Sequence, residues 1–94
     1  MILNSLRSVK EEKKLLQAFG DALREIRNAQ SFSQQALADL SGVDRAYISQ
    51  LELGESVPSI LIIFKLAETL KVKPSDIVNL MSQKSQQSPS QKSK

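Results

Sequence analysis

The chain has 94 residues, a length that fits one small domain, and its formal net charge is +3. It contains neither cysteine nor histidine. A disulfide framework is therefore excluded, and the residues used most often as metal ligands, nucleophiles and general bases are absent. We predict that the protein is not an enzyme and uses no cofactor or metal. The positive charge is compatible with a polyanionic partner but does not require one.

No part of the sequence is typical of a membrane segment. A transmembrane helix needs about 18 or more consecutive apolar residues, and no such run is present. The first residues, MILNSLRSVKEEKK, lack the basic start and the small-residue cleavage site of a signal peptide. We expect a cytoplasmic protein without a membrane partner.

Three zones of the chain differ in composition. Residues 1–14 are a polar N-terminal extension, and residues 15–81 carry a strong apolar pattern. Residues 82–94, SQKSQQSPSQKSK, contain no large apolar side chain. This last zone cannot bury enough surface to offset the entropy of ordering, so we expect a disordered tail after a single domain over residues 15–81.

The apolar pattern predicts an all-α fold with five helices. The expected helices cover about residues 15–29, 34–40, 45–53, 60–70 and 74–81. In the first helix, apolar side chains recur every three or four residues, as one buried stripe requires: Leu15, Leu16, Phe19, Leu23 and Ile26. This helix can also begin before residue 15, because the negative charges of Glu11 and Glu12 suit a helix N-terminus.

Short polar residues and a glycine mark the ends of these helices. Ser33, Asp44 and Ser59 are the expected N-caps, because their side-chain oxygens can accept a hydrogen bond from an unpaired backbone N–H. Gly54 suits the left-handed position that follows the helix expected over residues 45–53.

Residues 34–53, QQALADLSGVDRAYISQLEL, form the most informative window. Two short helical patterns are separated by a break at residues 41–43, where Gly42 lets the chain reverse. Ala38 is small enough for two backbones to approach closely. The residues expected to face inward are Leu37, Leu40, Ile48 and Leu51. This spacing predicts a helix-turn-helix, whose second helix can enter the major groove of DNA.

The side of the second helix that faces away from the core carries side chains suited to base edges. These residues are Arg45, Ala46, Ser49 and Gln50. Arg45 can donate two parallel hydrogen bonds to guanine, Gln50 can pair with adenine, and Ala46 suits a thymine methyl group. Gln34 and Gln35 lie at a helix N-terminus, where backbone N–H groups and the helix dipole favour phosphate.

Residues 23–77 resemble the lambda-repressor-like family of DNA-binding domains, the Cro/C1 or XRE type. The matching stretches are LREIRNAQSFSQQALADLSGVDRAYISQLELG and PSILIIFKLAETLKVKPSDI. The segment DRAYISQLE is also similar to the corresponding region of restriction–modification controller proteins. The resemblance implies a five-helix bundle in which the helix over residues 45–53 reads the major groove of double-stranded DNA.

The resemblance also implies roles for single residues. It implies base reading by Arg45, Ala46, Ser49 and Gln50, phosphate contacts by Gln34 and Tyr47, and a structural ion pair between Arg27 and Glu52. For Tyr47, partial packing against the helix expected over residues 34–40 or against the loop after residues 45–53 is an equal alternative. Glu52 and Asp44 are better explained as structural residues, because a carboxylate repels phosphate.

The helix expected over residues 60–70 is more apolar than one buried stripe requires. Ile60, Ile63, Ala67 and Leu70 are expected to form its inner face, which leaves Leu61 and Ile62 outside. A bundle of this size rarely hides so many large apolar residues. We therefore expect a homodimer interface on the last helix and the end of the helix before it. The residues predicted there are Ile77, Leu80 and Met81.

These features favour a sequence-specific DNA-binding transcriptional regulator, a repressor or autoregulator, that acts as a dimer on a palindromic operator. The two reading helices of such a dimer would lie about 34 Å apart, one turn of DNA. The alternative is a protein-interaction module, such as an antitoxin or adaptor, that uses the same bundle to bind a protein partner. The polar outer face of residues 45–53 favours DNA over that alternative.

Overall fold

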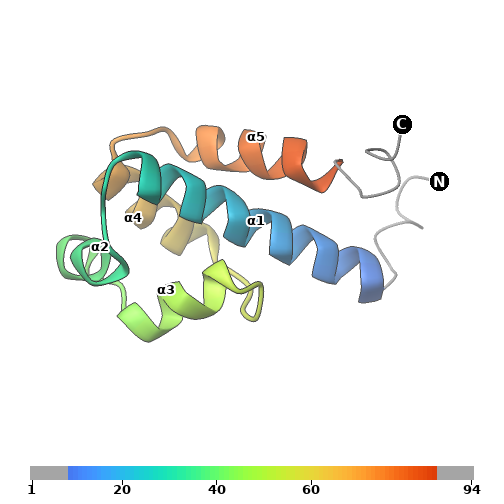
Figure 1. The fold of residues 1–94 in the computed structure, drawn as a ribbon, viewed down its shortest axis with the longest axis horizontal. Helices are drawn as coiled ribbons and strands as arrows, with labels where there is room; N and C mark the ends of the chain where they lie inside the picture. Colours follow the sequence, from blue (N-terminus) through green and yellow to red (C-terminus); the bar gives the residue numbers. More distant parts are fainter. Residues whose placement is uncertain (1–8, 87–94) are drawn as a thin grey trace.

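The computed structural model describes residues 9–86, and within this range the chain forms five helices and no strand. They are α1 (Val9–Ala29), α2 (Gln34–Ser41), α3 (Arg45–Glu52), α4 (Ile60–Leu70) and α5 (Pro74–Ser85) (Figure 1). The prediction of an all-α fold with five helices is confirmed.

The bundle is organised around α1, the longest helix. Helices α5 and α3 both pack against α1, and Figure 1 shows them on opposite sides of it. Helix α2 packs on α3 and α4, and α4 packs on α5. This arrangement leaves α2 and the outer side of α3 at one edge of the molecule, away from α5.

One apolar core joins all five helices. The largest fully buried side chains are Phe19, Leu23, Leu37, Ile48, Leu51, Leu66, Leu70 and Ile77, and every helix supplies at least one of them. Burying a side chain of this kind stabilises the fold by roughly 1.5–3 kcal/mol. Helices as short as α2 and α3 are marginal in isolation, so this tertiary packing is what holds them in place.

The first and last helices are longer than expected. Helix α1 begins at Val9, and Glu11 and Glu12 occupy its first turn, where the helix dipole favours negative charge. The disorder expected from residue 82 onward is wrong for the first part of that segment, because α5 continues to Ser85. Within this extension, Lys84 Nζ forms an ion pair with Glu25 of α1 at 2.7 Å. The rest of the expected tail lies outside the described residues.

Two residues expected to face inward are exposed instead. Leu40 is 65% exposed and Ile60 is 71% exposed, whereas Leu61 is outside as predicted. Ile62, expected outside, is half-buried and packs against the core. At 3.6 residues per turn, Leu40 lies roughly 110° around α2 from the midpoint of Leu37 and Ala38, the two residues that are buried. Ile60 is the first residue of α4 and precedes the turns that reach the core.

The expected caps are present at α2 and α4 but not at α3. Ser33 Oγ accepts from the Ala36 N–H at 2.9 Å, and Ser59 Oγ accepts from the Ile62 N–H at 3.1 Å. Asp44 occupies the N-cap position of α3, but its side chain makes no cap hydrogen bond. The Asp44 carboxylate therefore does not accept a hydrogen bond from the first backbone N–H groups of α3.

Three glycines allow close packing or a left-handed backbone. Gly42 ends α2 with φ 78°, and Gly54 follows α3 with φ 76°, as the tight turns require. The sequence alone did not indicate a role for Gly20, yet the backbone of α3 lies directly against it. A Cβ atom at Gly20 would lie 2.6 Å from the carbonyl oxygen of Glu52. A lone glycine inside a helical pattern was the available signal.

Candidate nucleic-acid interface

Helix α3 divides into a buried face and an exposed face. Ile48 and Leu51 are fully buried in the core, as predicted. Arg45, Ala46 and Gln50 are exposed on the other side, and Ser49 is half-buried beside them. The division follows from the helical period of 3.6 residues, because the two buried positions are three apart and share one face. The exposed side chains form a short polar surface that can approach a ligand without disturbing the core.

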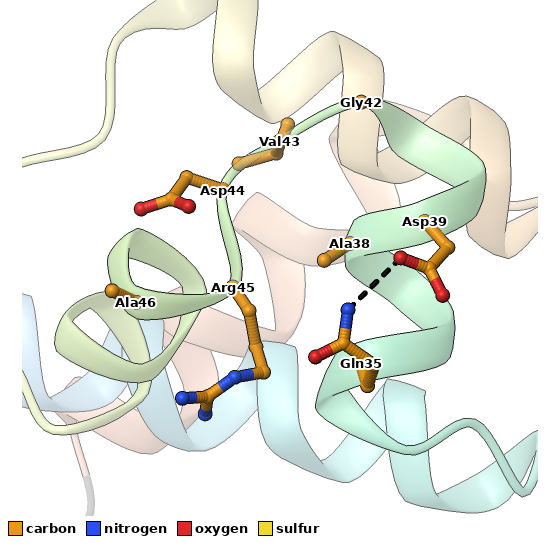
Figure 2. A pocket seen from close by; sticks show the side chains of 8 residues that line it. All are labelled: Gln35, Ala38, Asp39, Gly42, Val43, Asp44, Arg45 and Ala46. Carbon is orange, nitrogen blue, oxygen red and sulfur yellow. Dashed lines mark hydrogen bonds between the residues drawn. The ribbon is translucent and has the colours of Figure 1, made fainter.

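A polar hollow lies between α2 and the start of α3. Its lining comes from one side of α2, from the turn and from the first residues of α3: Gln35, Ala38, Asp39, Gly42, Val43, Asp44, Arg45 and Ala46. Figure 2 shows Gln35 and Arg45 on facing sides of this hollow. Gln35 Nε2 donates to Asp39 Oδ1 at 2.9 Å along the same helix. The arrangement places hydrogen-bond donors from two helices around one surface depression.

Two carboxylates, those of Asp39 and Asp44, line this hollow. The sequence predicted a role for Asp44 but none for Asp39. Asp44 precedes α3, and Asp39 lies one turn after Gln35 on α2. The available signal for Asp39 was its spacing of four residues from Gln35, which places the two side chains next to each other on a helix. Both acids will repel a phosphate backbone, so they restrict which part of a polyanion can lie against the hollow.

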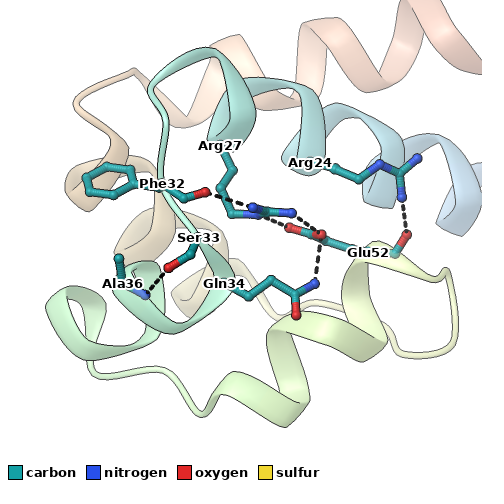
Figure 3. A network of polar contacts seen from close by, with 7 residues as sticks. All are labelled: Arg24, Arg27, Phe32, Ser33, Gln34, Ala36 and Glu52. Atoms are coloured by element: carbon teal, nitrogen blue, oxygen red, sulfur yellow. Dashed lines mark hydrogen bonds and ion pairs between the residues drawn. The ribbon is translucent and has the colours of Figure 1, made fainter.

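A buried ion pair connects α1 to the end of α3. Arg27 Nε donates to Glu52 Oε2 at 2.6 Å, and Arg27 Nη2 donates to Glu52 Oε1 at 2.8 Å. Both residues are buried (Figure 3). The hydrogen bond to Glu52 and its negative charge raise the pKa of Arg27 above its ordinary value, against the opposite effect of burial. The structure therefore contains the ion pair that the family resemblance implied.

Further hydrogen bonds extend this ion pair into a network. Arg27 Nη1 donates to the Phe32 carbonyl oxygen at 2.7 Å, which holds the segment between α1 and α2. Gln34 Nε2 donates to Glu52 Oε1 at 3.0 Å. Figure 3 shows these side chains converging on Glu52 from α1 and from the start of α2. The network fixes the position of α3 relative to the two preceding helices.

The other predicted contact residues of α3 are tied to the loop that follows it. Tyr47 Oη donates to the Val57 carbonyl oxygen at 2.9 Å, so the alternative of packing against this loop describes the structure. Ser56 Oγ donates to Gln50 Oε1 at 3.0 Å, a bond that does not use the Gln50 amide nitrogen. These bonds join residues 56–57 to α3 and make the loop part of the same surface.

The predicted dimer surface on α5 needs correction. Ile77 is fully buried in the core of the single chain and is not available to a partner. Leu80 and Met81 are half-buried, and Met81 packs against the core. Four of the exposed apolar residues lie just before and within the first turns of α4: Val57, Ile60, Leu61 and Phe64, each at least 54% exposed. On α5, Val78 is 45% exposed. Ile77 is buried because α5 packs against α1 and α4.

Two negative observations hold for the part of the chain that the structure describes. Among residues 9–86, no group of three or more acidic side chains is placed to hold a metal ion. None of the five helices in this range is long and apolar enough to cross a membrane.

The geometry defines a class of protein. Two short helices, α2 and α3, meet at a tight turn with a left-handed glycine, and the second helix exposes a polar face while its other face anchors it in a small bundle. This arrangement is a helix-turn-helix.

The helix-turn-helix family model HTH_3 matches residues 23–77, and the chain belongs to this family. Two similar proteins of Bacillus subtilis are the HTH-type transcriptional repressor RghR and the prophage-derived HTH-type transcriptional regulator YonR. RghR is 41% identical over 58 residues, which cover 61% of this chain and 43% of RghR. YonR is 33% identical over 54 residues, which cover 57% of this chain and 50% of YonR. The chain thus spans half or less of either relative.

Solved structures of named regulators share the fold. The restriction-modification controller protein C.AhdI of Aeromonas hydrophila is 44% identical with a TM-score of 0.65, and the match covers 66% of this chain and 94% of C.AhdI. The clp gene regulator ClgR of Corynebacterium glutamicum is 28% identical with a TM-score of 0.70, and the match covers 73% of this chain and 90% of that chain. These likenesses agree with the class that the geometry defines.

Proposed function

We propose that this protein is a sequence-specific DNA-binding transcriptional regulator, a repressor or autoregulator, that binds a palindromic operator as a homodimer. The observation that carries the proposal is the division of α3. Its inner face is completely buried, while Arg45, Ala46 and Gln50 are exposed on the outer face. The names of the similar proteins, which are transcriptional repressors and regulators, support the same function.

The outer face of α3 supplies the groups that base reading needs. Arg45 lies at the start of the helix, where the reading helix of a helix-turn-helix contacts base edges. Its guanidinium can donate two hydrogen bonds to guanine O6 and N7, a contact worth roughly 1–3 kcal/mol of discrimination. Ala46, Ser49 and Gln50 complete the reading surface.

Phosphate contacts would hold this helix in the groove. The first N–H groups of α2 have no partner within the helix, and only that of Ala36 is capped by Ser33. The remaining N–H groups and the side chain of Gln35 are available to a phosphate at this helix end. Tyr47 stands beside the loop at residues 56–57 and would contact the groove wall with its ring.

The homodimer would form through the exposed apolar surface of α4. Val57, Ile60, Leu61 and Phe64 are each at least 54% exposed, and a two-fold axis near them would pair these residues with the same residues of a second chain. An exposed apolar group of this size is typical of a protein interface. A dimer of this kind reads two half-sites, which predicts a palindrome with about one helical turn between their centres.

Selection of bound sequences from random duplex DNA tests the proposal. Wild type and the double variant Arg45→Ala, Gln50→Ala are compared at about 150 mM salt, where weak sequence-independent attraction is screened. We expect wild type to enrich a palindrome and the double variant to enrich none. Binding that falls steeply with salt, without an enriched sequence and without a difference between the two proteins, would contradict the proposal. It would favour a protein-interaction module instead.

A further inference from the structure

The loop after α3 is bonded to that helix on both sides of Ser56. The Glu55 N–H donates to the Gln50 carbonyl oxygen at 2.9 Å, a bond that closes the end of the helix. On the other side, Tyr47 Oη donates to the Val57 carbonyl oxygen at 2.9 Å. The bonds of its two neighbours therefore hold Ser56 beside α3, and they do not use the Ser56 side chain.

The hydroxyl of Ser56 is bonded to a side chain of the proposed reading surface. Ser56 Oγ donates to Gln50 Oε1 at 3.0 Å, within the normal range for such a bond. Ser56 is half-buried, whereas Gln50 is exposed on the outer face of α3. The hydroxyls of Ser33 and Ser59 differ, because they accept from backbone N–H groups and cap helices. The Ser56 hydroxyl instead acts on the amide of Gln50.

This bond affects the group that Gln50 needs for an adenine. A glutamine amide carries one acceptor oxygen and two N–H donors. Pairing with adenine uses both ends at once, because the oxygen accepts from N6 while the nitrogen donates to N7. An oxygen held at Ser56 is not free to lie against an adenine edge, but the nitrogen keeps both hydrogens. Such an amide suits bases that present acceptors, guanine with O6 and N7 or thymine with O4.

Resting on the proposed function, we propose that Ser56 is a specificity-determining residue that acts through Gln50. Its hydroxyl holds Gln50 Oε1 at the loop, which makes Gln50 a hydrogen-bond donor to guanine or thymine and prevents the two-bond pairing with adenine. Ser56 exerts this effect without a base contact of its own. The assignment departs from the adenine pairing that the sequence predicts for Gln50.

A base analogue shows whether Gln50 accepts a hydrogen bond from adenine. Selection from random duplex DNA gives the operator of wild type, and the base pair read by Gln50 is the one at which Gln50→Ala loses its preference. Duplexes then carry at this position, on either strand in turn, adenine or purine, which lacks the 6-amino group. The ratio of the two affinities, measured with the full-length proteins at about 150 mM salt, reports the bond from N6.

We expect wild type to give the same adenine-to-purine ratio as Gln50→Ala. Ser56→Ala frees the oxygen and should raise the ratio about fivefold, the effect of one additional hydrogen bond between neutral groups. Ser56→Thr keeps a hydroxyl and should retain the wild-type ratio. The matched control Ser59→Ala removes a hydroxyl three residues further on and should also leave the ratio unchanged.

A double variant separates an effect through Gln50 from a direct contact with DNA. If Ser56 acts through Gln50, adding Ser56→Ala to Gln50→Ala leaves the ratio and the selected sequence unchanged. A further change in the double variant would mean that Ser56 contacts the DNA itself, and it would overturn the proposal.

Other results would also overturn the role of Ser56. One is a wild-type ratio above that of Gln50→Ala, a test that requires no variant of Ser56. The others are an unchanged or lower ratio in Ser56→Ala, and a Gln50→Ala protein that keeps every base preference of wild type. All of these leave wild-type specificity in place. If wild type itself selects no sequence, the proposed function fails and this role fails with it.

Discussion

Helices α3 and α4 bury one apolar face each, but their exposed faces differ. Ile48 and Leu51 of α3 and Leu66 and Leu70 of α4 are all fully buried. Outside, α3 presents arginine, alanine and glutamine, whereas the first turns of α4 present isoleucine, leucine and phenylalanine. Both helices must bury apolar side chains in the core, so only their exposed side chains can determine which partner each helix binds. A polar outer face suits base edges, and an apolar one suits another protein surface.

The largest expected effect comes from breaking the anchor of α3. Arg27→Met leaves the carboxylate of Glu52 buried without its charge partner, and we expect a loss of about 3–5 kcal/mol in the free energy of unfolding. Urea denaturation measures the change. The matched control is Asp21→Ala, which removes an exposed ion pair with Arg24 and should cost about 1 kcal/mol or less. Equal losses of unfolding free energy in the two variants would contradict the expectation that the buried ion pair stabilises the fold more than the exposed one.

A methyl group at Gly20 tests how closely α3 must approach α1. Gly20→Ala would place a Cβ atom against the backbone of Leu51 and Glu52, so we expect a loss of about 1–3 kcal/mol from overpacking. Thermal unfolding measures the stability of this variant and of the control Asn28→Ala. Asn28 is exposed on the same helix, so the control should change stability by no more than about 0.5 kcal/mol. Without the contact, alanine would stabilise α1 by helix propensity. A more stable Gly20→Ala protein would therefore contradict this contact.

A polar substitution on the exposed face of α4 tests whether the proposed homodimer forms through this face. Leu61 is 64% exposed, so Leu61→Lys should leave the fold intact while it places a charge in the proposed interface. We expect the dissociation constant of the dimer to rise at least tenfold, about 1.4 kcal/mol, in sedimentation equilibrium. The control Val9→Lys changes a residue of similar exposure at the far end of α1. A monomeric wild type, or the same effect from both variants, would contradict an interface on α4.

The smallest expected effect compares how the two helices begin. Ser59 caps α4 with a hydrogen bond, and Ser59→Ala should cost about 1 kcal/mol. Asp44 makes no such bond to α3, so Asp44→Ala should cost clearly less. Chemical denaturation of both variants measures the difference. A greater loss for Asp44→Ala would mean that its carboxylate stabilises α3 in solution after all.

The local features of this protein could be predicted from its sequence. The helical period separates Ile48 and Leu51 from Arg45 and Gln50, because it depends only on residues within one or two turns. The caps at Ser33 and Ser59 follow from the same local chemistry. Asp44 shows what the local sequence does not determine. The residue type predicted the N-cap position of α3, but not that the side chain would make no cap hydrogen bond there.

Contacts between distant residues could not be predicted in the same way. Leu40 and Ile77 are both large and apolar, yet one is exposed and the other fully buried. The difference depends on which neighbouring helix covers each face. The hydrogen bond from Tyr47 to Val57 likewise depends on the path of the loop after α3.

By itself, the sequence determined five helices, most of their ends, the helix-turn-helix and the polar character of the outer face of α3. These properties depend on the order of residues along short stretches of backbone. Only the tertiary structure decided that the amide of Gln34 lies on Glu52, that Gly20 must stay small, and that Ile77 is buried while Ile60, Leu61 and Phe64 of α4 are exposed. Each of these depends on the distance between groups that the chain brings together from far apart, and hydrogen bonds and close packing act only at short range.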